Sequence, residues 1–188
     1  ILPEHDRVVV VGGRKVFTYE FVPKTSTSEI SFELSFLHQT NDRNAGGNNL
    51  YPFLHLSSNR NLFIFFNSDS IQLNLRRNRV IKTFSRILGE RSRNYPSSDS
   101  FVILSLVHID NFQKVEVMVC GGSSTRELEV VGKGRFLEGL RSCGIMVITG
   151  NNNKWEMEYM SKSHLLHDML ILPIGNILII NWANTWLC

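Results

Sequence analysis

Residues 50–67 read LYPFLHLSSNRNLFIFFN and carry the pattern that decides the fold. An apolar strand is expected over Leu50–Leu56, a polar turn over Ser57–Arg60 and a second apolar strand over Asn61–Phe66, closed by Asn67. The second strand is apolar nearly throughout, which is typical of a strand that is buried on both faces. The stretch therefore predicts a β-hairpin packed between two neighbouring sheets.

The same order of strand, turn and strand occurs three more times. The second strands of these copies are predicted over Arg7–Val11, Val115–Cys120 and Ile177–Ile180. Counted between the closing residues Gly13, Asn67, Gly122 and Asn181, the intervals are 54, 55 and 59 residues. A strand-built repeat of roughly 50 residues is typical of the blades of a kelch-like β-propeller. The Gly pairs suit close backbone approach and positive φ, because glycine has no Cβ.

The segments between the hairpins also alternate in the manner of strands, so each period supplies about four. We therefore predict an all-β chain of about three and a half antiparallel, four-stranded blades. The blade periods are expected near residues 1–24, 48–90, 93–160 and 164–188. No convincing helix is seen, although Phe136–Arg141 has the spacing for one helical turn.

Composition and charge narrow the function classes. The formal net charge is +3, which is too weak to indicate nucleic acid by itself. Two basic clusters are interpreted as solvated loop faces, with an anion or polysaccharide contact as the alternative; they are Arg76, Arg77, Arg79 and Lys82, and Arg86, Arg91 and Arg93. The apolar run Ile177–Ile180 is too short to span a bilayer. Ile1–Val11 does not have the character of a signal peptide, because charged residues interrupt it.

Two groups of side chains suggest local chemistry. His164, His167 and Asp168 resemble a metal triad, but residues three apart on a strand point to opposite faces, which argues against it. Cys120 and Cys143 lie on candidate strands of one blade. They are compatible with a disulfide of a secreted protein or with two buried thiols.

Aromatic residues and loops offer further candidates. Tyr51 and Tyr95 are candidate radical sites, but neither has a Cys nearby in sequence, so packing in the core or at the rim is favoured. Trp155, followed by Met157 and Met160, is interpreted as packing between blades rather than as a substrate platform. The pair Gly132 and Gly134 lacks the strand–turn–helix context of a phosphate loop. The polar loops Gln39–Asn49 and Gly121–Gly134 are candidates for framing a binding mouth.

Five blocks resemble the glyoxal oxidase-like family, a relative of galactose oxidase, in the family's own order. They are Arg7–Arg14 with Phe17–Phe21, Asn48–Leu56, Arg93–Ser98, Val117–Gly122, and Asp168–Pro173 with Gly175 and Ile179–Asn181. The resemblance covers nearly the whole chain. It implies a seven-bladed kelch-like parent and an extracellular or cell-wall copper radical oxidase. Such an enzyme converts small aldehydes or alcohols and O2 into the oxidised product and H2O2.

The resemblance also implies where the copper ligands lie. The family holds copper with two tyrosines and two histidines, and one tyrosine is cross-linked to a cysteine. By the family pattern the cysteine and the cross-linked tyrosine precede Ile1, and the Tyr-His pair and the last histidine follow Cys188. We therefore expect no catalytic, cofactor-binding or metal-binding residue within the chain, and no bound copper.

The sequence departs from the family at several hairpins. The tight Asp-Gly turn is replaced by Glu4–Asp6 and by Ser57–Arg60, and the segment before Asp168 reads His164–His167. These departures leave two functional hypotheses open, part of a copper radical oxidase or a degenerate, non-catalytic propeller module that binds or scaffolds. Open blade edges are also expected to favour self-association.

Overall fold

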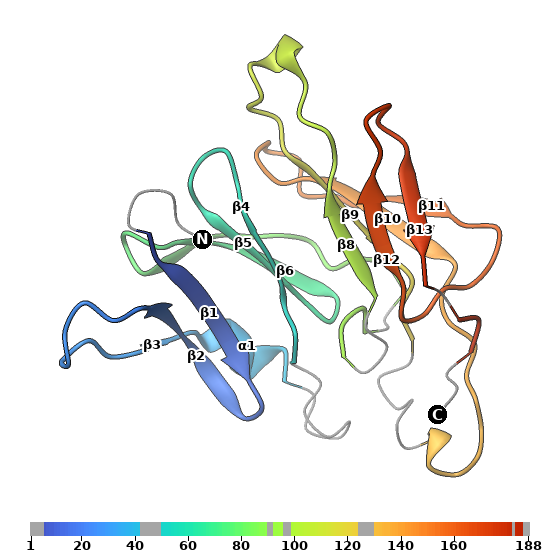
Figure 1. Ribbon diagram of the computed structural model, residues 1–188, viewed down its shortest axis with the longest axis horizontal. Helices are drawn as coiled ribbons and strands as arrows, with labels where there is room; N and C mark the ends of the chain where they lie inside the picture. Colours follow the sequence, from blue (N-terminus) through green and yellow to red (C-terminus); the bar gives the residue numbers. More distant parts are fainter. Residues whose placement is uncertain are drawn as a thin grey trace.

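The computed structural model describes residues 6–41, 50–89, 92–95, 99–123, 130–181 and 183–185. Its strands form four antiparallel sheets (Figure 1). The first sheet contains β1 (Val8–Gly13), β2 (Val16–Val22) and β3 (Phe32–Glu33). The second contains β4 (Phe53–Leu56), β5 (Leu62–Phe66), β6 (Asp69–Asn74) and β7 (Arg79–Thr83). The third contains β8 (Ser100–Ile103), β9 (Glu116–Cys120), β10 (Ser142–Val147) and β11 (Glu156–Tyr159), and the fourth contains β12 (Asp168–Ile171) and β13 (Ile177–Ile180).

The sheets follow one another in chain order, from the blue strands at the left of Figure 1 to the red strands at the right. Within the second and third sheets the strand order is also the chain order, as in a propeller blade. This arrangement confirms the predicted all-β, propeller-like fold. In the described part of the chain, no helix is long and apolar enough to cross a membrane.

Two predictions about helices were wrong. A short helix, α1 (Ser35–Gln39), follows β3 and buries Phe36 and Leu37 in the first core. It is stabilised by that tertiary packing, because an isolated helix of this length is not stable in water. Phe136–Arg141, for which one helical turn was considered, contains no helix and pairs instead through a single bridge from Glu138 to Thr185.

Strand β5 explains how the sheets hold together. All five of its residues are buried. Leu62, Ile64 and Phe66 pack into the core shared with the first sheet, whereas Phe63 and Phe65 pack into the core shared with the third. Successive side chains of a strand point to opposite faces. A strand that is buried on both faces therefore has apolar residues at every position.

The closing residues of the repeats all have positive φ. The values are 145° at Gly13, 54° at Asn67, 115° at Gly122 and 55° at Asn181, as expected for the Gly and Asn at these positions. Close approach adds a second requirement at Gly121, where an added Cβ would lie 2.6 Å from the carbonyl oxygen of His164. The predicted role of the Gly pair is therefore confirmed in the third repeat.

The departures from Asp-Gly turns are visible as left-handed residues. In the β4–β5 turn Arg60 has a φ of 62° and its N–H donates to the Ser57 carbonyl oxygen at 2.8 Å. The β12–β13 turn has the same hydrogen bond, from Gly175 to Leu172 at 2.8 Å, and Gly175 has a φ of 85°. The two turns thus share a left-handed conformation. In the β4–β5 turn this conformation falls on an arginine, a residue type that disfavours it.

Candidate functional site

A buried arginine in the segment between β7 and β8 binds the third sheet. Arg93 is fully buried, which corrects the prediction that its basic cluster forms a solvated face. Its Nη1 donates to the carbonyl oxygens of Gly121 at 2.6 Å and of Ser142 at 2.7 Å. Burial lowers the pKa of Arg93, while the nearby negative charge of Asp99 raises it. The guanidinium therefore ties the end of β9 to the start of β10.

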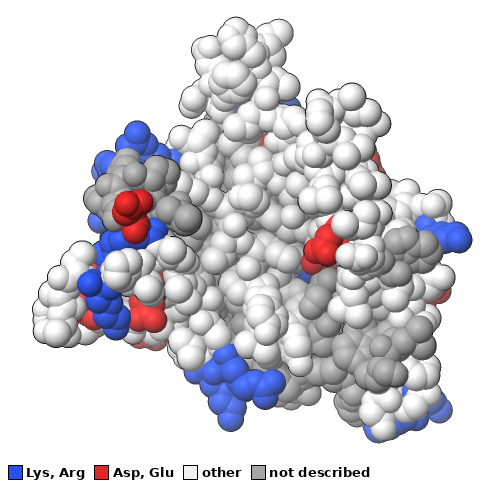
Figure 2. Space-filling model, in the orientation of Figure 1, with Lys and Arg blue, Asp and Glu red and all other residues white. Residues whose placement is uncertain are grey.

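Lys82 of the first cluster also departs from the prediction of a solvated face, because it is half-buried and its Nζ donates to the Gly150 carbonyl oxygen. The other described arginines of the two clusters behave as predicted. Arg76, Arg77 and Arg79 are exposed at and after the β6–β7 turn, and exposed Arg86 pairs with Asp69 at 3.0 Å. Arg91 lies outside the described residues. On the face shown in Figure 2, the basic side chains in view lie mostly at the edges, and the middle of the face is mostly uncharged apart from an acidic patch.

The two histidines before β12 lie together, contrary to the sequence argument. Their rings are 5.7 Å apart between centroids, and both are buried. The premise was wrong because β12 begins only at Asp168 and the chain bends at Leu166, where φ is 53°. Among the described residues, neither ring nitrogen of His167 has a hydrogen-bond partner. Burial and the neighbouring His164 lower the pKa of His167 to about 4, although Asp168 opposes the shift.

Cys120 and Cys143 form a disulfide between directly opposed residues of β9 and β10. Of the two alternatives for these cysteines, the structure therefore has the disulfide. Both residues are buried, and Met169 of β12 packs on them. The disulfide thus lies between the third and fourth sheets and beside the carbonyl groups that Arg93 binds.

A hollow of about 510 Å³ lies where β1 ends and β4 begins. The Gly12–Gly13 pair, Arg14, Tyr51, Pro52 and Tyr95 contribute to its wall. The rings of Tyr51 and Tyr95 are 6.1 Å apart between centroids. Tyr51 is 71% exposed and Tyr95 is half-buried, so packing at the rim is confirmed and packing in the core is excluded. A cavity of this size falls within the range of roughly 300–1,000 Å³ that small-molecule sites occupy.

Tyr51 has an unusual backbone. Its φ is 58°, which costs a non-glycine residue roughly 1–2 kcal/mol. The conformation is held by Asn94, whose Nδ2 donates to the Tyr51 carbonyl oxygen at 2.9 Å. The Asn94 side chain is itself fixed, because its Oδ1 accepts from the Asn67 N–H at 2.7 Å. Sequence reasoning missed Asn94 and Arg14; the only available signal was the position of Arg14 directly after the Gly pair.

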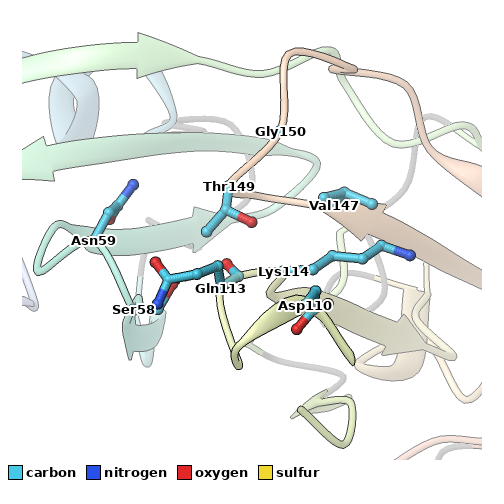
Figure 3. A pocket seen from close by; sticks show the side chains of 8 residues that line it. All are labelled: Ser58, Asn59, Asp110, Gln113, Lys114, Val147, Thr149 and Gly150. Atoms are coloured by element: carbon cyan, nitrogen blue, oxygen red, sulfur yellow. The ribbon is translucent and has the colours of Figure 1, made fainter. Parts of the chain in front are cut away.

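A second hollow, of about 380 Å³, lies at the opposite end of β4 (Figure 3). Its side chains come from the β4–β5 turn, the loop before β9 and the loop after β10, and most are polar. Several of these groups already serve the local structure. Ser58 Oγ donates to the Gln113 carbonyl oxygen at 3.0 Å, and Thr149 Oγ1 accepts from the Val115 N–H at 3.0 Å. We therefore regard the Tyr51 hollow as the candidate site.

Trp155 and the glycine-containing loop are structural. Trp155 packs edge-on against Phe65 with a centroid distance of 5.8 Å, and its Nε1 donates to the Ser85 carbonyl oxygen at 2.9 Å. The prediction of packing between blades is confirmed. Gly132 and Gly134 lie in a turn. Of the proposed mouth loops, Gln39–Asn49 lies mostly outside the described residues, and Gly121–Gly134 lies outside them only in its middle, at residues 124–129.

The described residues do not fit the copper ligand set that the resemblance implies. Among the described residues, no group of three or more His, Cys, Asp or Glu side chains is placed to hold a metal ion. Tyr51 packs beside Tyr95 in the wall of the hollow. His164 packs on His167 before β12.

Comparison with known proteins identifies the relatives of this chain. A family model described as the glyoxal oxidase N-terminus matches residues 1–186. The chain is 36% identical to aldehyde oxidase GLOX1 of Arabidopsis thaliana over 181 residues, which are 94% of this chain and 29% of the relative. It is 34% identical to aldehyde oxidase GLOX of Vitis pseudoreticulata over 184 residues, 98% of this chain and 33% of the relative. The chain thus spans about a third of the length of these curated relatives. It belongs to the glyoxal oxidase family and corresponds to the family's N-terminal region.

Proposed function

We propose that this chain forms part of the propeller of a copper-dependent oxidase that acts on small aldehydes or alcohols. Such an enzyme transfers two electrons and two protons from the substrate to O2, which leaves as H2O2. The observation that supports the proposal most directly is the family match, because it runs through residues 1–186 and falls on four successive sheets. Both relatives named above are described as aldehyde oxidases. The blade boundaries near residues 1–24, 48–90, 93–160 and 164–188 are part of this proposal.

We also propose that the 188 residues by themselves do not catalyse. The family's copper site needs adjacent tyrosine and histidine ligands, and no Tyr-His dipeptide occurs in the sequence. In this proposal the propeller strands are supplied here and the copper ligands come from other parts of the same protein.

Location and self-association follow from the same interpretation. We propose an extracellular or cell-wall location, which the disulfide between Cys120 and Cys143 supports because such bonds persist in oxidising compartments. We propose self-association through the first and last sheets, where large apolar side chains are exposed. These are Val8, Val10, Val16 and Val22 in β1 and β2, and Leu170, Ile174 and Leu178 in and between β12 and β13.

A peroxide-release assay tests the proposal. The purified 188-residue chain, supplied with copper and a panel of small aldehydes and alcohols, is expected to release no more H2O2 than free copper does. A longer product of the same gene that carries the Cys motif, the Arg-Trp-Tyr motif and the Tyr-His pair is expected to release it with aldehydes. Copper-dependent peroxide from the 188 residues would overturn the placement of the ligands, and an inactive longer product that carries them would overturn the assigned activity.

A second function, a non-catalytic binding or scaffold module, is favoured by one observation. The turn residues Asp6 and Arg60 hold left-handed conformations that an Asp-Gly turn would adopt more easily. Coding sequence on either side of the chain discriminates between the two functions. Absence of the three motifs in frame supports the scaffold, and their presence supports the oxidase.

A further inference from the structure

Two buried histidines lie directly before β12 and have no part in the proposed oxidase. His164 is 9% exposed and His167 is 3% exposed. Among the residues that the structure describes, no hydrogen-bond partner is present at either ring nitrogen of His167. Burying a polar ring without a hydrogen bond costs free energy. A ligand that takes up a lone pair of this ring would offset that cost, so the pair marks a candidate binding site.

The hydrogen bond of His164 fixes which of its nitrogens is able to bind a ligand. Its Nδ1 lies 2.8 Å from the carbonyl oxygen of Lys162. Because a carbonyl oxygen only accepts, Nδ1 carries the proton, and in the neutral ring the lone pair is at Nε2. Histidines that bind metal ions almost always donate their other N–H to a carbonyl or carboxylate oxygen in this way. His164 is therefore arranged as a metal ligand arranges itself.

The separation of the two rings suits one ion held between them. With metal–nitrogen distances of about 2.0–2.1 Å, two imidazoles on one ion have ring centroids no more than roughly 6.5 Å apart. The centroids of His164 and His167 are 5.7 Å apart. The left-handed backbone of Leu166 produces this approach, since it bends the chain between the two residues. The two side chains therefore do not point to opposite faces, as they would in a continuous strand.

The number and kind of ligands decide between metal ions. Zn²⁺ sites in proteins use three or four protein ligands, and the described part of the chain places no three His, Cys, Asp or Glu side chains around one ion. Two imidazoles are sufficient only for an ion that accepts two ligands in a line, such as Cu(I) or Ag(I). Met169 is buried two residues after His167 and packs on the disulfide, so a soft thioether lies in the same region, as such ions prefer.

We propose that His164 and His167 bind one Cu(I) ion between the third and fourth sheets, through Nε2 of His164 and one ring nitrogen of His167. The ion would fix the start of β12 against the end of β9, because the His167 ring lies next to Gly121. This site is separate from the family's copper centre, since it uses no tyrosine. It binds an ion and transfers no electron. The proposal therefore does not depend on the oxidase assignment, and the peroxide assay above does not test it.

Binding is measured by NMR on the full 188-residue chain after treatment with a chelator. Ag(I) is the probe, because it has the coordination preference of Cu(I) and is not oxidised by air. Cys188 is replaced by Ser throughout, since a thiol binds the same ions. We expect the ring protons of His164 and His167 to shift and to saturate at one ion per chain, while exposed His108 stays unchanged. Equal shifts at His108, or binding of Zn²⁺ as tight as that of Ag(I), would overturn the proposal.

Variants with a matched control locate the ion. His164→Gln and His167→Gln, which keep a polar side chain of similar size, are each expected to weaken Ag(I) binding roughly tenfold or more. His108→Gln is the control and should bind as the parent chain does. Ag(I) is also expected to raise the urea midpoint of the parent chain and of His108→Gln, but not that of His164→Gln. Parental affinity in both His164→Gln and His167→Gln would refute the assignment. The shifts of the parent chain decide the question even where a variant fails to fold.

Discussion

The two junctions that join the third sheet to its neighbours are built differently. We call the contact with the second sheet the apolar junction; its buried residues include Phe63, Phe65, Val117, Val119 and Trp155. We call the contact with the fourth sheet the polar junction; it contains Cys120, Cys143 and Met169, with His164 and His167 beside them. The apolar junction relies mainly on burial, with a hydrogen bond from Trp155 to Ser85 across it. The polar junction has few buried apolar side chains and a covalent bond.

Sheets of the same architecture are thus stabilised by different interactions at the two junctions. Each buried aromatic or aliphatic side chain contributes roughly 1.5–3 kcal/mol by leaving water. Where few such side chains are present, as around Met169, the disulfide and the hydrogen bonds of Arg93 restrain β9 and β10 instead. The disulfide responds to reductant, and the buried His167 beside it responds to acid, whereas an apolar core is insensitive to both.

The largest expected effect is loss of the apolar junction. Phe65→Ala removes a fully buried ring that packs on Trp155 and Phe53, and it is expected to lower the free energy of unfolding by about 3–5 kcal/mol. Urea denaturation followed by tryptophan fluorescence measures the change. The control is Leu170→Ala on the exposed side of β12, for which we expect much less than half of that loss. Equal losses in the two variants would show that the apolar junction is not the stronger one.

Removal of the disulfide is the next largest effect. The bond joins residues 23 positions apart, and a loop of this length is worth about 2–4 kcal/mol of stability. Dithiothreitol is therefore expected to lower the urea midpoint of the wild-type chain. The double variant Cys120→Ala and Cys143→Ala should start at the lowered midpoint and show no response to the reductant. If alkylation after reduction added no mass beyond that of alkylation without it, the bond would be absent.

The third test of the comparison is the acid sensitivity of the polar junction, which has the smallest expected effect at neutral pH. His167 takes up a proton less readily when folded, with a pKa of about 4, than when unfolded, with the ordinary value of 6.5. The folded state therefore loses stability as the pH falls below 6.5, and the loss levels off below about pH 4 near 3 kcal/mol. His167→Leu is expected to flatten this part of the pH profile of the urea midpoint, while His108→Gln at an exposed site leaves it intact. A profile equally steep in His167→Leu would assign the acid sensitivity to other groups.

Much of the sheet structure was predictable because it depends on local patterns. The apolar run Asn61–Phe66 became β5, and Ile177–Ile180 became β13 with the expected bounds. The Gly and Asn residues that close the repeats take the positive φ that their chemistry allows. Helix α1 was missed since its five residues carry no helical periodicity of their own and are stabilised by the first core.

Some residues of the candidate site were noticed in the sequence, but their arrangement could not be predicted. Tyr51 and Tyr95 were recognised as notable residues, but their pairing depends on Asn94 and on the meeting of two sheets. Arg93 was misread because charge in a loop usually means exposure, and nothing in the sequence shows the carbonyl oxygens that surround it. The histidines were misread because their separation suggested a strand, whereas a left-handed Leu166 brings the rings together.

The sequence by itself determined the class of fold, the repeat and the family, because strand periodicity and turn residues act over a few neighbouring positions. The tertiary structure alone decided that Cys120 and Cys143 form a bond, that Arg93 is buried and that Tyr51, with its positive φ, lines one hollow together with Arg14. Each of these features depends on atoms supplied by segments distant in the chain, and their positions are fixed only when the sheets pack together.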